Sequence, residues 1–257
     1  NLMAEITGYI DFAQVLLYVF WAFFAGLVFY LVREGKREGY PVVYDGEQNR
    51  PYTDFPPIPK PKKFLLHDGT TVEAPAAPNE RDNLNLEPSA KWQGAPFIPT
   101  GDPMLDGVGP GSYALRKNVP DLLPDGEIKI VPLRDASSFS ISSRDPDPRG
   151  MDVIGADGLI AGKISDVWVD RGEFIIRYLE VAVKDNPAKR VLLPIMFAEI
   201  SGSRNDVRVN AILASQFADV PTVATPGQVT FLEEDRICAY YGAGTLYAWE
   251  ERADPLL

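Results

Sequence analysis

Residues 12–32 read FAQVLLYVFWAFFAGLVFYLV, and this stretch decides how the rest of the chain is organised. It contains no charged side chain, and Gln14 is its only strongly polar residue. As an α-helix it would be about 31 Å long, close to the ~30 Å hydrocarbon thickness of a bilayer. A buried helix of a soluble domain would normally show a polar stripe, and this stretch has none. The sequence therefore predicts a single transmembrane helix over 12–32.

A cleaved signal peptide is the alternative interpretation of the same stretch. Signal peptides begin with a basic region, have a shorter apolar run and end at a small-residue cleavage site. The residues before position 12 instead carry acids and no Lys or Arg, and no cleavage pattern follows. Arg33, Lys36 and Arg37 come directly after the stretch. The positive-inside rule then places the short N-terminus (1–11) outside and the remainder in the cytoplasm.

Composition excludes several classes of protein. The 257 residues include 36 acidic and 25 basic side chains, a formal net charge of −11, which argues against a nucleic-acid-binding protein. Cys238 is the only cysteine and His67 the only histidine. These counts exclude a disulfide framework, a multi-thiolate or iron–sulfur site and a zinc site with two histidines from this chain. No phosphate-binding glycine loop or nucleophile elbow occurs either.

Proline dominates the region after the apolar stretch, and more than half of the 23 prolines lie between residues 41 and 120. Because proline fixes φ and removes a backbone donor, this region is predicted to be extended, with short strand-like runs at 63–66 and 70–73. Apolar side chains recur through it: Phe55, Ile58, Phe64, Leu65, Trp92, Phe97, Ile98 and Met104. A free linker has less need of them, so we expect the segment to pack on a surface.

Alternation of apolar and polar residues marks the last part of the chain. It occurs in KISDVWVD (163–170), FIIRYLEVAVKD (174–185), RVLLPIMFAEI (190–200) and DVRVNAIL (206–213), with turn signals between them. Short strands at this spacing predict a small antiparallel barrel or sandwich. A short helix is predicted over Leu232–Tyr241, with Gly242 and Gly244 ending it.

Charged side chains gather near these predicted strands. One group holds Asp166, Asp170, Glu173 and Glu180 with Arg171 and Arg177, and a second holds Asp125, Glu127 and Lys129. Alternating carboxylates and cations titrate at staggered pH values and can pass protons. The solvated strand edge of an acidic protein gives the same pattern, and the residues alone favour that simpler interpretation.

Six blocks run in order from the end of the apolar stretch almost to the C-terminus. They are REGKREGYPVV (33–43), TGDPMLDGVGPGSYALR (100–116), KIVPLR (129–134), DPDPRGMDVIGADGLIAGKISDVWVDR (145–171), RYLEV (177–181) and FLEEDRICAYYGAGTLYA (231–248). In content, order and spacing they resemble the H subunit of purple-bacterial photosynthetic reaction centres.

The resemblance implies a single transmembrane helix followed by a mainly β cytoplasmic domain, an antiparallel β-barrel of the PRC type, with a short C-terminal helix. The expected divisions are a periplasmic N-terminus (1–11), the helix (12–32), a Pro-rich extended segment on partner subunits (33–120) and the barrel domain (121–257). The chain would sit in the bacterial inner, intracytoplasmic membrane.

The resemblance also implies a non-enzymatic subunit that binds no pigment and caps the L and M subunits. Those subunits carry bacteriochlorophyll, bacteriopheophytin, quinones, non-haem iron and a carotenoid. A tetrahaem cytochrome subunit, core light-harvesting antenna polypeptides and membrane lipids are further expected partners, and nucleic acid is not. The role implied for this chain is to stabilise the core, shield the secondary quinone site and help conduct protons to the reduced quinone.

Residues implicated in that proton path match charged positions here. Glu173, Asp170, Asp125 and Glu127 are the expected proton-transfer residues, and Lys129 and Arg177 the supporting charges. Some family members have histidines near the proton entrance, where this chain reads PDGEIK (124–129) without one.

Two rival hypotheses remain from other classes of protein. A membrane-anchored adaptor would use the barrel only to bind a soluble protein, and it would purify without colour. A membrane-tethered hydrolase would use Asp166, Asp170 and Glu173, but the sequence supplies no nucleophile or metal set for it.

Overall fold

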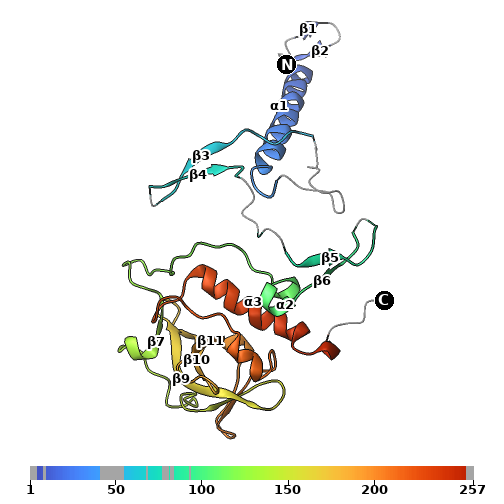
Figure 1. The fold of residues 1–257 in the computed structure, drawn as a ribbon. Coiled ribbons are helices and arrows are strands. Elements are labelled where there is room, and N and C mark those ends of the chain that lie inside the picture. Colours follow the sequence, from blue (N-terminus) through green and yellow to red (C-terminus); the bar gives the residue numbers. More distant parts are fainter. Residues whose placement is uncertain are drawn as a thin grey trace. The chain divides into compact units, whose positions relative to one another are not determined.

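The computed structural model describes residues 5–7, 10–40, 55–67, 69–76, 81, 84–92 and 94–252. The chain divides into two compact units (Figure 1). The first comprises residues 1–79 and 90–95, and the second comprises 80–89 and 96–257.

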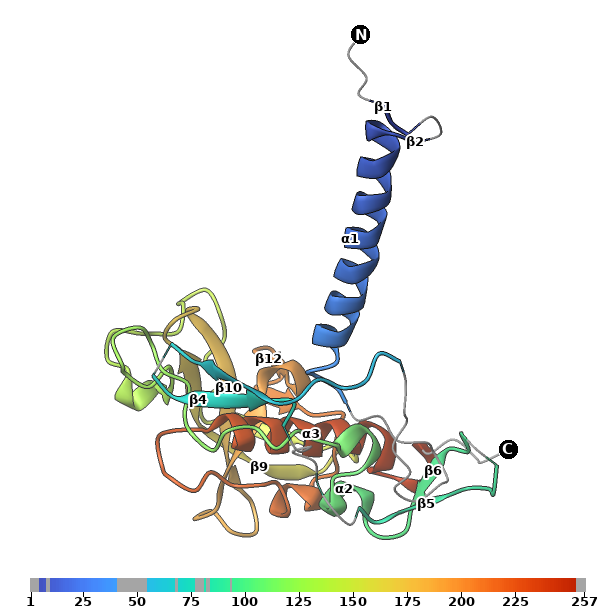
Figure 2. The ribbon, with the colours of Figure 1, turned by 90° about the horizontal axis from the view of Figure 1, so that it is seen from above.

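A long apolar helix, α1 (Phe12–Gly35), dominates the first unit. The strands β1 (Glu5–Thr7) and β2 (Ile10–Asp11) precede it, and Figure 2 shows α1 as one uninterrupted helix beyond them. Asp11 caps its start by accepting a hydrogen bond from the Gln14 backbone N–H at 2.8 Å. No side chain of α1 is buried, and its apolar window has a mean hydropathy of 2.4. Among the described residues it is the one helix with the length and composition to cross a membrane, as predicted.

A two-stranded hairpin is the other regular element of the first unit. It pairs β3 (Lys62–Leu65) with β4 (Thr71–Ala74) in antiparallel register, with Phe64 opposite Val72. Both strands were predicted, each within one residue of its observed bounds. All four residues of β3 are exposed within this chain.

The second unit begins with the C-terminal part of the Pro-rich segment. Here β5 (Leu86–Pro88) pairs with β6 (Phe97–Pro99), and two short turns of helix follow, α2 (Pro103–Asp106) and η1 (Gly109–Gly111). Both turns pack against α3 (Phe231–Tyr247), and Met104 and Val108 are buried there. This stretch of the Pro-rich segment therefore packs on its own chain.

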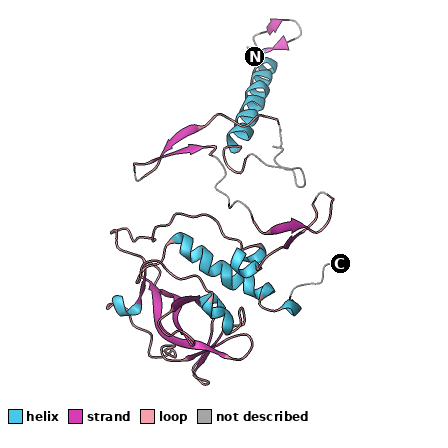
Figure 3. Ribbon diagram, viewed as in Figure 1, coloured by secondary structure: helices cyan, strands magenta, loops and turns pink. Residues whose placement is uncertain are grey.

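A seven-stranded curved sheet forms the body of the second unit (Figure 3). Its strands are β7 (Ile130–Pro132), β8 (Asp152–Ile154), β9 (Ile160–Asp170), β10 (Ile175–Val183), β11 (Arg190–Pro194), β12 (Glu199–Ser201) and β13 (Asp206–Arg208). The spatial order is β11-β10-β9-β8-β13-β12, and β7 pairs with the last three residues of β9. Pairing is antiparallel as predicted, except that β8 and β13 run parallel.

Short 3₁₀ turns complete the second unit. They are η2 (Leu133–Asp135), η3 (Ile195–Phe197), η4 (Ser215–Ala218) and η5 (Glu250–Arg252). The inner face of the sheet and α3 share one apolar core, whose largest fully buried side chains include Trp168, Leu179, Phe217 and Tyr241. Each such side chain contributes about 1.5–3 kcal/mol by leaving water.

The start of α3 follows the rules for helix capping. The Thr230 hydroxyl accepts from the Glu233 N–H at 3.2 Å, and the Glu233 carboxylate accepts from the Thr230 N–H at 2.9 Å. This reciprocal pair satisfies two otherwise unpaired donors of the first turn.

The end of α3 differs from the prediction. The helix continues through Gly242 and Gly244 to Tyr247, so the expected stop after Tyr241 is wrong. A Cβ at Gly244 would lie 2.4 Å from Ile212 Cγ2. Glycine is needed here for close packing of the helix on its neighbour rather than to end the helix.

Candidate functional site

The tip of the β9–β10 hairpin carries two of the predicted site residues. Asp170 ends β9, and its Oδ1 accepts hydrogen bonds from the N–H groups of Gly172 at 2.9 Å and Glu173 at 3.0 Å. Phe174 closes the turn in the left-handed region, with φ of 59°. The Asp170 side chain is 1% exposed and that of Glu173 56% exposed. A buried carboxylate thus fixes the turn from which a more exposed one projects.

Lys129 joins these two carboxylates from the strand β7 side. Its Nζ lies 3.5 Å from Asp170 Oδ2, 3.4 Å from Glu173 Oε1 and 3.4 Å from Asp121 Oδ2. Partial burial lowers the pKa of Lys129, but the facing carboxylates of Asp170 and Asp121 raise it more, and the net shift is upward. Lys129 therefore stays charged, which fits a supporting charge better than a proton carrier.

Asp121 is a member that the sequence reasoning missed. Leu122 forms an isolated antiparallel bridge with Ile128, so the chain doubles back and brings Asp121 beside Lys129. The turn signal Pro124-Asp125-Gly126 was the only indication of this reversal. We call Asp121, Lys129, Asp170 and Glu173 the Lys129 cluster.

Asp125 and Glu127 lie in that same turn. Asp125 Oδ1 accepts from the Glu127 backbone N–H at 3.0 Å, so its carboxylate also shapes the turn. Glu127 Oε2 lies 3.5 Å from Arg171 Nη2, and Arg171 also donates from Nε to the Ile128 carbonyl at 3.0 Å. These two carboxylates are therefore adjacent to the Lys129 cluster in the fold and outside its ion pairs.

Arg177 belongs to a different group of charges. Its Nη2 lies 3.9 Å from Glu234 Oε2, which also accepts a 2.6 Å hydrogen bond from the Tyr178 hydroxyl. Burial is the main cause that raises the pKa of Glu234; Tyr178, Arg177 and Arg116 oppose it, and Asp121 adds to it. Nothing in the sequence indicated Glu234, because its partners Arg177 and Tyr178 come from β10, which is far from α3 along the chain.

Asp166 and Glu180 form a separate buried pair. Arg134 Nη1 lies 3.1 Å from Asp166 Oδ2 and 3.1 Å from Glu180 Oε2, and Trp168 Nε1 donates to the latter oxygen at 3.1 Å. Asp166 thus pairs with Arg134. The hydrolase hypothesis required Asp166 to lie with Asp170 and Glu173, and the structure does not group them. Across the described ranges, no group of three or more His, Cys, Asp or Glu is placed to hold a metal ion.

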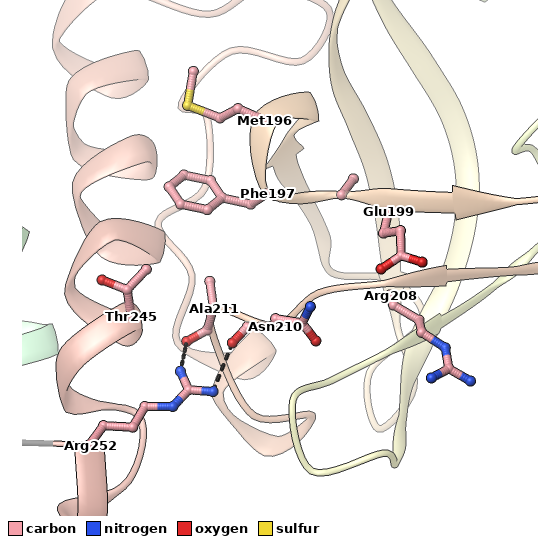
Figure 4. A pocket seen from close by; sticks show the side chains of 9 residues that line it. Met196, Phe197, Glu199, Arg208, Asn210, Ala211, Thr245 and Arg252 are labelled. Carbon is pink, nitrogen blue, oxygen red and sulfur yellow. Dashed lines mark hydrogen bonds between the residues drawn. The ribbon is translucent and has the colours of Figure 1, made fainter.

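A surface pocket of about 390 Å³ lies between β12, β13 and the end of α3 (Figure 4). Its floor is tied together by Arg252, which donates to the carbonyls of Ala211 at 3.1 Å and Asn210 at 2.8 Å. Arg208, at the rim, lies 3.5 Å from Asp206. Both guanidinium groups are therefore engaged in contacts within the chain. None of the predicted site residues lines this pocket, and the Lys129 cluster is the candidate site.

The Lys129 cluster gathers opposite charges at one place in the second unit. It contains three carboxylates and one ammonium group, and the Lys129 Nζ lies within 3.5 Å of an oxygen of each carboxylate. The ammonium group lies within 3.5 Å of both the buried and the exposed carboxylate. One cation thus joins a buried carboxylate to an exposed one.

Comparison with known families agrees with the sequence blocks and the fold. Residues 4–135, more than half of the chain, match the N-terminal region of the photosynthetic reaction centre H chain. Residues 141–215 match the PRC-barrel domain, and they contain β8 to β13 of the curved sheet. The chain therefore belongs to the family of photosynthetic reaction centre H chains.

Proposed function

We propose that this H subunit shields the secondary quinone site of its reaction centre and helps to conduct protons to the reduced quinone. The observation that carries the proposal is the Lys129 cluster, in which Nζ lies 3.5 Å from buried Asp170 and 3.4 Å from exposed Glu173. A quinone buried under protein needs titrating groups between it and water.

The positions of the predicted residues favour distinct roles. Glu173, exposed on this chain alone, is the inner relay residue that faces the core subunits, and Asp170 is its buried partner. Asp125 and Glu127, on the neighbouring turn, provide the entrance in place of the histidines found in other members. Lys129 and Arg177 hold the local field and do not carry protons.

Family membership implies association with the reaction centre core subunits. We infer that the Pro-rich segment lies on the L and M subunits, which hold the bacteriochlorophyll, bacteriopheophytin, quinones, carotenoid and non-haem iron. Phe55, Leu65, Trp92 and Phe97 support this, because each is more than half exposed within this chain. The basic residues after the apolar stretch favour a cytoplasmic barrel domain and a periplasmic N-terminus. On this view the chain is a non-enzymatic subunit.

Glu173→Gln tests the relay in the intact complex. The substitution keeps the size of the side chain and removes its ability to carry a proton. We expect the proton-coupled second electron transfer to the quinone to slow by about tenfold or more, because a positioned proton carrier typically contributes at least this much. Flash-induced absorption changes measure that rate, and primary charge separation, which needs no proton, is expected to stay unchanged.

Glu199→Gln is the matched control. Glu199 is an exposed acid of β12, outside the Lys129 cluster, and its Oε1 lies 3.1 Å from Arg204 Nη2. It removes the same charge and leaves the Lys129 cluster intact. If the second electron transfer in Glu173→Gln is as fast as in wild type at every pH, the relay role of Glu173 is contradicted.

A further inference from the structure

Another surface pocket of the second unit lies at the end of β9 opposite the Lys129 cluster, and its volume is about 360 Å³. We call it the β9 pocket; its lining includes Ile160, Gly162, Lys163, Ala182, Lys184 and Pro187. Because β9 begins at Ile160 and ends at Asp170, the length of this strand separates the pocket from the Lys129 cluster. The β9 pocket is therefore independent of the proton relay proposed above.

Small residues create this hollow in the curved sheet. Gly162 of β9 lies opposite Val183 of β10, and a Cβ at Gly162 would clash with the Ala182 carbonyl oxygen. The close approach of the two strands thus requires glycine at this position. Ala182 adds only a methyl group beside it, and Ile160 and Pro187 extend the apolar lining. A concave apolar surface of this volume is typical of a small-molecule site.

The charges of the β9 pocket do not cancel. Lys163 Nζ lies 2.6 Å from Asp152 Oδ1, so this lining pair is neutral. Lys184 is exposed, and it forms no ion pair with an acidic side chain in the part of the chain that the structure describes. One uncompensated ammonium group therefore borders an apolar hollow, in a chain whose net charge is −11.

We propose that the β9 pocket binds a small amphipathic carboxylate, with Lys184 as its main polar contact. The single uncompensated ammonium group matches one negative charge. A phosphate monoester carries about −1.5 to −2 at pH 7 and would keep part of its charge uncompensated. The described lining also contains no arginine, whose planar fork suits phosphate. The apolar lining removes the aliphatic chain of the ligand from water.

Photoaffinity labelling of the intact complex in mild detergent tests this proposal. The probe is an octanoic acid analogue with a diazirine near the end of its chain, and the matched primary amide has the same chain without the charge. Peptide mass spectrometry distinguishes labels in the β9 pocket from labels elsewhere. We expect the acid to label residues 160–163 and 182–187 and octanoate to displace it. The amide should bind about fivefold more weakly, because a partly exposed ion pair contributes about that factor.

Lys184→Gln removes the uncompensated charge and keeps the apolar lining. We expect it to raise the acid concentration that gives half-maximal labelling about fivefold and to leave the labelling by the amide unchanged. Ala182→Leu fills the hollow and should reduce the labelling by both probes. Lys117→Gln is the matched control, because Lys117 is an exposed lysine of the second unit outside the β9 pocket, and it should be labelled as wild type is.

Equal labelling by the acid and the amide, or wild-type labelling of Lys184→Gln, would overturn the proposal. A label that octanoate does not displace would also overturn it, because such a label reports non-specific partitioning of the chain. Stronger displacement by octyl phosphate than by octanoate would identify a phosphate site and contradict the match to a single negative charge.

Discussion

Glu180 illustrates how a buried carboxylate is kept ionised in this fold. Its oxygens accept from Ser165 Oγ at 2.7 Å, from Trp168 Nε1 at 3.1 Å and from both Nη atoms of Arg134. Burial raises the pKa of Glu180, but these hydrogen bonds and the Arg134 charge lower it more, so that the net shift is downward. The native state therefore binds the proton of Glu180 less readily than the unfolded chain does.

The downward pKa shift of Glu180 predicts a pH-dependent stability. A carboxyl with a depressed native pKa stabilises the fold above its unfolded pKa, about 4.3, and this contribution is lost as the pH falls through the native pKa. We expect Glu180→Gln to lower the free energy of unfolding by about 1–3 kcal/mol at pH 7, because Trp168 and Arg134 lose their acceptor. At about pH 3 the difference in the free energy of unfolding between Glu180→Gln and wild type should be smaller.

Urea unfolding of the full chain, followed by tryptophan fluorescence, measures the free energy of unfolding of Glu180→Gln and of wild type at pH 7 and at about pH 3. Glu199→Gln, an exposed acid outside the buried pair, is the control and should stay near wild type. An equal loss of stability at pH 7 and at about pH 3 would show that Glu180 acts through packing rather than through its charge.

The candidate site was predictable from sequence where its members are close in the chain. Asp170 and Glu173 share one turn, and the alternation of the flanking strands gave both the turn and their position. Lys129 joins them through the pairing of β7 with β9, which local pattern does not specify. Asp121 and Glu234 were missed because their partners come from other elements, and such contacts depend on tertiary packing.

At the scale of elements, α3 shows packing prevailing over helix propensity. Alanine in place of glycine normally stabilises a helix interior by about 1 kcal/mol. At Gly244, however, a Cβ would lie 2.5 Å from the Ala211 carbonyl oxygen and 2.4 Å from Ile212 Cγ2. We expect Gly244→Ala to destabilise the chain by about 1–3 kcal/mol, because the helix must shift to admit the methyl group. Urea unfolding measures the sign of the effect directly.

Gly242→Ala provides a graded comparison within the same helix. A Cβ there would lie 3.1 Å from the Pro110 carbonyl oxygen, a tight contact that a small shift relieves. Its effect should therefore be smaller than that of Gly244→Ala. A Gly244→Ala protein more stable than wild type would show that propensity decides at this position.

The same helix explains why element ends were predicted less well than element types. Glycine is a common stop signal, and Gly242 and Gly244 were interpreted in that way. In the structure they lie where α3 meets η1 and the chain after β13, a reason that only the assembled fold reveals. The long strands β9 and β10 were predicted more closely, because one buried face imposes a two-residue alternation. The run at 190–200 instead holds two strands, β11 and β12, with η3 between them, and the run at 206–213 is a strand only over β13.

At the scale of the whole molecule, the Pro-rich segment is used in two ways. Its part at Met104 and Val108 is buried against α3, so its apolar side chains are accounted for within the chain. The hairpin of β3 and β4 instead leaves Phe64, Leu65 and Val72 exposed. Sequence predicted that the segment packs on a surface and could not separate these two cases, because proline-rich chain lacks the periodicity that identifies a buried face.

The exposed hairpin yields a prediction about assembly. If it lies on the core subunits, Leu65→Ser removes an apolar contact that contributes about 1.5–3 kcal/mol when fully buried. We expect the dissociation constant of this chain for the pigmented core to rise about tenfold, since Leu65 is 76% exposed in the chain alone. Near-infrared absorption of the material that co-purifies with the tagged chain in mild detergent measures how much of the pigmented core the chain retains.

Leu159→Ser, at a leucine that is 63% exposed in the second unit, is the control and should retain the pigment as wild type does. A colourless wild-type preparation from pigmented cells would contradict the assembly itself, whereas equal retention by Leu65→Ser and wild type would place the hairpin away from the core.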